Sequence, residues 1–167
     1  IIAAGAVLHY LKDTEHPHLQ HITSLQRIDK ADYLWMDKFT IRNLELLGGV
    51  DSNNSLLKVL DNTVSPMGAR LLKRWMLMPL TETAKIEERQ EAVEYFIKSP
   101  EEKTRIGQYI KQAGDIERLV SKIPLKKINP REVLHIGKGL KLVGQIKELC
   151  DVSANEYLKR LGDSLNP

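Results

Sequence analysis

The densest group of side chains able to bind a metal ion lies near the N-terminus. His16, His18 and His21 fall within six residues, and neutral imidazole is a common metal ligand. Pro17 prevents these three side chains from sharing one face of a regular helix, and no neighbouring cysteine completes a set of ligands. The sequence therefore favours a surface loop at 14–21 over a metal site.

No pattern typical of an enzyme active site occurs in the sequence. Gly137 and Gly139 flank Lys138, but this triplet lies inside a helical pattern and lacks the flanking residues of a phosphate-binding loop. No Ser/His/Asp or Cys/His set has the spacing of a known catalytic family. The single cysteine, Cys150, excludes an internal disulfide and is typical of a reducing compartment. We expect no catalysis, no cofactor, no metal and no membrane span in this chain.

Basic residues are concentrated in one segment. The whole chain has a formal charge of +3, whereas residues 103–147 contain eleven basic and three acidic residues, a net charge of +8. Such a segment could bind nucleic-acid phosphates, but basic helices are also common solvated faces. Both interpretations stay open here. The candidate phosphate contacts are Lys126, Lys127, Arg131, Lys138 and Lys141.

Hydrophobic periodicity predicts a mainly α-helical fold. Aromatic residues make up only 5% of the chain, which weighs against a sheet-rich fold. Ser65 as N-cap, Pro66 at the first helical position and Pro79 as a stop delimit one helix. A second amphipathic run follows Asp115. The predicted structural core consists of Met67, Leu71, Trp75, Met78, Ile116, Leu119, Val120 and Ile123.

A long helix is predicted from Pro130, with Asn129 as its cap. Apolar residues recur at steps of three and four from 133 to 149, as in a helix packed along a partner. Glycines at 137, 139 and 144 lower its intrinsic helicity by up to about 1 kcal/mol each. Packing or a close helix approach must compensate for that cost.

The remaining segments give shorter elements. Asp37 should cap a helix that ends before Gly48 and Gly49. Apolar segments 22–27 and 33–36 flank a polar turn and are compatible with one short β pair. In the helix expected after Pro79, Ile86, Gln90, Val93 and Ile97 mark the inner face.

Three motifs, in order, resemble one known family. Residues 63–75 read TVSPMGARLLKRW, residues 40–46 read TIRNLEL and residues 114–119 read GDIERL. Together they resemble the core region of the MutS family of DNA mismatch-recognition proteins. The resemblance implies the end of a connector segment at 1–21, a helical core at 22–128 and the start of the lever helices at 129–167.

The resemblance also implies what the longer parent protein does. MutS-type proteins are DNA-dependent ATPases that use ATP and Mg²⁺ and act on mismatched double-stranded DNA, as homodimers that cooperate with a MutL-type partner in the bacterial cytoplasm. The region matched here is their structural core and lever, which couples nucleotide state to DNA clamp placement. Neither a nucleotide-binding motif nor the family's mismatch-wedging Phe-x-Glu motif is present in the sequence.

By the same resemblance, Arg42, Asn43 and Glu45 would contact another domain of the protein. Spacing alone gives a simpler alternative, a surface ion pair between Arg42 and Glu45 worth a few tenths of a kcal/mol. Two other functions also remain as alternatives: a helical protein-interaction adaptor that uses the 133–149 stripe, and a non-specific basic DNA-binding module. A MutS-like paralogue without a repair role is a further alternative.

Overall fold

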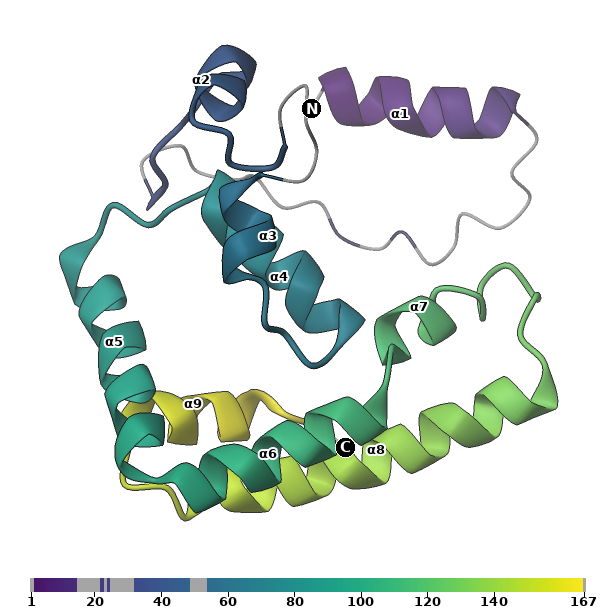
Figure 1. Ribbon diagram of the computed structural model, residues 1–167. Coiled ribbons are helices and arrows are strands. Elements are labelled where there is room, and N and C mark those ends of the chain that lie inside the picture. Colours follow the sequence, from purple (N-terminus) through teal and green to yellow (C-terminus); the bar gives the residue numbers. More distant parts are fainter. Residues whose placement is uncertain (1, 15–21, 23, 25–31, 49–53, 167) are drawn as a thin grey trace.

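A computed structural model describes residues 2–14, 22, 24, 32–48 and 54–166 of the chain (Figure 1). This part of the chain is helical and confirms the predicted mainly α fold. Its helices are α1 (Ile2–Asp13), α2 (Lys38–Asn43), α3 (Leu56–Leu60), α4 (Pro66–Leu77), α5 (Thr83–Lys98), α6 (Pro100–Ala113), α7 (Ile116–Val120), α8 (Pro130–Asp151) and α9 (Glu156–Ser164).

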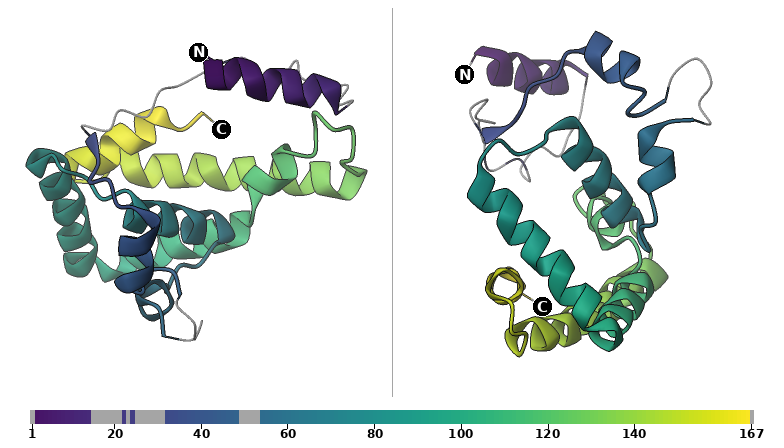
Figure 2. Two further views of the ribbon diagram at one scale, coloured as in Figure 1. Left: turned by 90° about the horizontal axis from the view of Figure 1, so that it is seen from above. Right: turned by 60° about the vertical axis from the view of Figure 1, so that its left-hand side comes forward.

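The best-packed part of the molecule is built around α8. The α6 helix lies along α8, α9 folds back onto its C-terminal half, and α7 contacts it as well (Figures 1 and 2). Small buried residues line these contacts, namely Ala113, Gly139, Cys150 and Gly162, together with the larger Leu158. Short side chains let the helix backbones approach closely. The α6–α9 body therefore forms the main scaffold of the described chain.

The α3–α4 pair lies at the N-terminal end of α5, and α5 runs from there to the α6–α9 body (Figure 2). The α1 helix has no buried residue and lies at the edge of the molecule. None of the described helices is long and apolar enough to cross a bilayer.

Most helix starts follow from their capping residues. The side chains of Asp37, Ser65, Asp115 and Asn129 each accept a hydrogen bond from a backbone N–H of the first turn, as the sequence predicts. Asn129 and Glu132 form a reciprocal capping box at the start of α8. At the start of α5, Glu82 occupies the N-cap position and makes no capping side-chain hydrogen bond.

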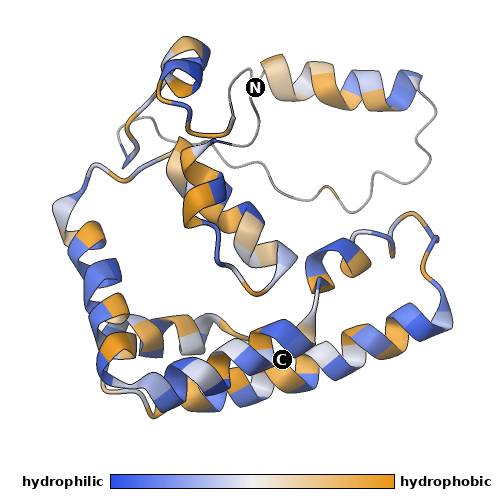
Figure 3. Ribbon diagram, viewed as in Figure 1, coloured by the Kyte–Doolittle hydropathy of each residue, from blue (hydrophilic) through white to orange (hydrophobic). Residues whose placement is uncertain are grey.

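The structural core predicted from the sequence needs correction. None of its eight residues is buried: Met67, Met78, Ile116 and Leu119 are half-buried, whereas Leu71, Trp75, Val120 and Ile123 are 38–49% exposed. The reason is geometric. Among the helices, α4 packs mainly against the short α3, so no long helix covers its wide apolar face. Figure 3 shows the apolar residues along α4.

The expected inner face of α5 is likewise wrong. Ala92 is the buried residue of this helix, while Val93 and Ile97 are 60% and 72% exposed. Val93, Ile97 and Trp75 instead line an open groove of about 520 Å³ between α4 and α5. The Arg89 guanidinium lies over the Trp75 ring, 3.8 Å from its centroid, a cation–π contact that covers part of the indole.

The strand expectation also needs correction. Tyr33 forms an isolated antiparallel bridge with Leu80, next to the end of α4, and the Leu34 N–H donates to the Pro79 carbonyl at 2.8 Å. The described 33–36 segment therefore pairs with the chain that follows α4 at one position and forms no β-strand. The 22–27 segment lies mostly outside the described residues.

The glycines of α8 show where close approach is required. A Cβ added at Gly139 would lie 2.6 Å from Cδ1 and 2.9 Å from Cγ1 of Ile116, whereas one added at Gly137 would meet nothing within 4 Å. The predicted close helix approach is therefore confirmed at Gly139, which is buried where α8 passes α7. At Gly137, by contrast, packing does not require a glycine.

Gly139→Ala and Gly137→Ala form a matched pair on one helix. Gly137→Ala should stabilise the fold by up to about 1 kcal/mol, because alanine has the higher helix propensity. Gly139→Ala should destabilise it by about 1–2 kcal/mol, because Ile116 must move. Urea denaturation followed by circular dichroism measures both. Equal stabilisation by the two substitutions would show that α7 and α8 do not meet at Gly139.

Candidate functional site

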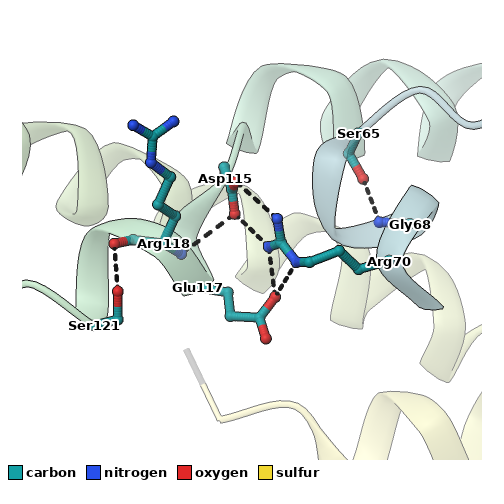
Figure 4. A network of polar contacts seen from close by, with 7 residues as sticks. All are labelled: Ser65, Gly68, Arg70, Asp115, Glu117, Arg118 and Ser121. Carbon is teal, nitrogen blue, oxygen red and sulfur yellow. Dashed lines mark hydrogen bonds and ion pairs between the residues drawn. The ribbon is translucent and has the colours of Figure 1, made fainter. Parts of the chain in front are cut away.

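A single arginine ties together two of the sequence motifs. The Arg70 guanidinium on α4 donates to both carboxylate oxygens of Asp115, at 2.6 and 3.1 Å, and twice to Oε2 of Glu117, at 2.5 and 3.0 Å. Figure 4 shows the guanidinium between the two carboxylates. We call these three residues the Arg70 fork. It joins α4 to α7 across 45 residues of sequence.

Local backbone structure positions Arg70 on one side of the fork and Asp115 on the other. Ser65 accepts a hydrogen bond from the Gly68 N–H at 3.1 Å and sets the start of α4 one turn before Arg70. On the other side, Gly114 ends α6 with φ of 70°, a conformation that favours glycine. The chain thus turns sharply and brings Asp115 to the start of α7.

Asp115 has two roles at this point. One of its oxygens accepts the Arg118 N–H of α7 at 3.3 Å, and the same carboxylate binds Arg70. The Arg70 guanidinium lowers the pKa of Asp115 below its usual value, against a smaller opposing effect of desolvation and with help from the Arg118 N–H. The Asp115 side chain is 19% exposed and that of Arg70 47% exposed. The contact between Asp115 and Arg70 is therefore partly screened by solvent, and the lowered pKa keeps Asp115 ionised at neutral pH.

The sequence contains a signal for this contact, although neither Arg70 nor Glu117 was predicted as a site residue. Asp115 was named only as the residue before an amphipathic run. Arg70 lies in the 63–75 motif, and both acids lie in the 114–119 motif. Opposite charges in two motifs far apart in sequence indicate that the motifs could meet in space. Arg70, Asp115 and Glu117 are the residues that the structure adds.

The residues predicted to contact another domain lie together at the end of α2. Arg42 and Asn43 end the helix, and Glu45 follows with φ of 51°. The Glu45 carbonyl accepts the Leu56 N–H at 2.9 Å, which joins this turn to α3. All three side chains are exposed, and among the described residues no ion pair joins Arg42 to Glu45. Interdomain contact by these residues stays a prediction.

The predicted phosphate-binding residues are all exposed. Lys126 and Lys127 lie in the turn between α7 and α8, with Lys126 at φ of 53°. Arg131 lies in the first turn of α8, and Lys138 and Lys141 lie farther along it. The structure therefore distributes them over the turn and more than two turns of α8. DNA contact by these residues stays a prediction.

The sequence offers two further groups of potentially reactive side chains, the N-terminal histidines and Cys150. The histidines at 16, 18 and 21 lie outside the described residues. Within the described part of the chain, no three His, Cys, Asp or Glu side chains are grouped as metal ligands. Cys150 is buried between α8 and α9, and burial raises the pKa of its thiol. A buried neutral thiol is a poor nucleophile.

Comparison with known proteins identifies the family. Residues 39–166 match the family described as MutS domain III. The DNA mismatch repair proteins MutS of Parabacteroides distasonis and Bacteroides fragilis are each 47% identical to the chain, and that of Christiangramia forsetii is 48% identical. Each alignment covers 99% of this chain and 19% of the relative. The chain spans about a fifth of the length of these relatives.

Arg70→Gln should lower the melting temperature by about 2–4 °C, because it removes the hydrogen bonds of the fork and leaves Asp115 and Glu117 facing each other. Lys73→Gln on the same helix is the control, since Lys73 is exposed and has no ion pair among the described residues. Thermal melts followed at 222 nm test the pair. Identical melting temperatures for the two variants would contradict a stabilising fork.

The fork should also lose its effect in acid. Because the folded pKa of Asp115 is lowered, its contribution to stability is present above the unfolded value of about 3.9 and disappears as the pH falls through the folded pKa. The difference in melting temperature between the wild type and Arg70→Gln should therefore be largest near pH 7 and shrink below about pH 4. Melts at pH 7 and pH 3 measure it. A constant difference would exclude a carboxylate partner for Arg70.

Proposed function

Because the chain belongs to the MutS domain III family, we propose that it is the structural core and lever module of a longer MutS-type mismatch-recognition protein. In this proposal the module couples the nucleotide state of an ATPase domain to the placement of the clamp that holds DNA. It performs no catalysis itself. The chain's share of its relatives, about a fifth of their length, agrees with a module inside a larger protein.

The whole protein, on this proposal, is a DNA-dependent ATPase that uses ATP and Mg²⁺. Its substrate is mismatched double-stranded DNA, which is what the names of the relatives suggest. Homodimer formation, a MutL-type partner and a bacterial cytoplasmic location belong to the same proposal. Arg42, Asn43 and Glu45 are its candidate contacts with another domain.

The form of α8 supports a mechanical role. A helix of 22 residues is about 33 Å long, and this one has a capping box at its start and lateral packing against α6 and α9. Lateral packing along a helix opposes bending. A displacement applied near its N-terminal end would therefore reach its far end with little loss.

The Arg70 fork is the observation on which the proposal mainly depends. It holds α4 to the start of α7, and Ile116 of α7 packs against Gly139 of α8. A continuous set of contacts thus leads from α4 to the long helix. Rigid elements connected in this way are the physical means by which two distant sites can be coupled.

The adaptor alternative has less support. It requires the apolar stripe at 133–149 to be free for a partner protein. On the helix that packs against α6 and α9, four residues of the stripe are half-buried: Ile136, Val143, Ile146 and Leu149. Val133 and Leu140 remain 53% and 39% exposed. Much of the stripe is therefore already used within the chain.

The proposal is tested in the full-length protein that contains this chain. Arg70→Gln should reduce the effect of ATP on affinity for a mismatched duplex by about fivefold, because it removes one contact of the proposed coupling path. Fluorescence anisotropy with and without ATP measures the coupling. ATP affinity measured without DNA should stay unchanged, because the fork lies in a segment that contains no nucleotide-binding motif.

Lys73→Gln serves again as the control and should preserve the ATP effect. The double variant Arg70→Gln/Asp115→Asn should lose little more than Arg70→Gln alone, because both substitutions break the same contact. An ATP effect of normal size in Arg70→Gln would overturn the proposed role of the fork in coupling.

A further inference from the structure

A charged cavity that is open to solvent lies beside the Arg70 fork, between α7 and the N-terminal end of α8. Its volume is about 450 Å³, large enough for a phosphate group. Its lining includes Asp115, Arg118, Lys122, Arg131, Glu132 and His135. Basic groups thus converge on it from α7, from the turn after α7 and from α8. Of these residues, only Arg131 is among the phosphate contacts predicted from the sequence.

Both carboxylates of the cavity already have cationic partners. Asp115 binds Arg70, and Glu132 binds the Lys122 ammonium at 2.5 Å and accepts the Asn129 N–H at 3.1 Å. Lys122 is the main cause of the lowered pKa of Glu132, with the Asn129 N–H second. Each acid is thus ionised and neutralised locally. Neither is left to repel an anion at full strength.

The two remaining cations are both arginines. Among the described residues, no ion pair joins the guanidinium of Arg118 or Arg131 to a carboxylate. Figure 4 shows the Arg118 side chain directed away from the Arg70 fork. Both side chains are exposed to solvent and line the cavity. A guanidinium presents a planar set of donors that suits two oxygens of one phosphate group.

The cavity has a defined wall. A Cβ added at Gly114 would lie 2.9 Å from Nε2 of His135, so the imidazole rests against the Gly114 backbone. The capping box meanwhile holds the start of α8, and with it the backbone that carries Arg131. From these contacts we infer that the cavity binds a phosphate group through Arg118 and Arg131, with His135 at its side. The phosphate is either part of a nucleic-acid backbone or a small free phosphate compound.

Two probes distinguish these sources with the 167-residue chain. Isothermal titration with inorganic pyrophosphate reports a free phosphate ligand, and anisotropy of a labelled 20-base-pair duplex, matched or with a G·T mismatch, reports a phosphodiester ligand. Arg118→Gln/Arg131→Gln should weaken binding of the preferred probe by about tenfold or more, because charge-assisted hydrogen bonds to two guanidinium groups are lost. For DNA, the slope of the logarithm of the binding constant against the logarithm of the salt concentration should also decrease, by the equivalent of about two phosphate contacts.

Arg105→Gln/Lys111→Gln is the charge-matched control. Both residues are exposed on α6, within the basic segment and outside the cavity, and this variant should weaken binding less than about twofold. Circular dichroism shows whether each variant keeps its helices. Equal losses in the two double variants, or no binding of either probe up to about 10 mM, would overturn the inference. Because no ATP is present, the outcome is independent of the proposed coupling role.

Discussion

The contact between Arg70 and the carboxylates of Asp115 and Glu117 joins α4 to the α6–α9 body. The α6–α9 body is held by helix packing, whereas α4 has no extensive apolar contact with that body among the described helices. A charged contact at a partly exposed position depends on geometry and on ionisation. The hydrogen bonds of this contact therefore require a defined orientation of α4 and α7, and they hold the helices less firmly than a packed apolar core would. Such a link can hold one arrangement of rigid helices and still permit another.

The same carboxylate links helix capping to this connection. Asp115 must be at the start of α7 to cap it, and it must face α4 to bind Arg70. Gly114 allows both by taking a backbone conformation unfavourable for other residues. On the far side of the turn, His135 of α8 rests against Gly114. One short segment therefore orients three helices and forms a wall of the adjacent cavity.

The apolar surface of α4 and α5 is left open within the described chain. Trp75, Val93 and Ile97 line a groove that no other helix of the described chain fills. A sequence pattern reports which face of a helix is apolar, but it does not say which element covers that face. For this reason the core residues predicted on α4 were wrong although the helix itself was predicted correctly.

The sequence by itself determined the local structure. Capping residues, prolines and hydrophobic period predicted the starts of α2, α4, α7 and α8, because these effects act within a few residues of the chain. The three motifs indicated the family for the same reason, since they can be recognised without knowing what they contact. Only the tertiary structure decided that Arg70 meets Asp115 and Glu117, that Tyr33 pairs with Leu80, and that Gly139, unlike Gly137, is a contact point. Each of these joins residues more than 20 positions apart, and their distance in space depends on how all the intervening helices pack.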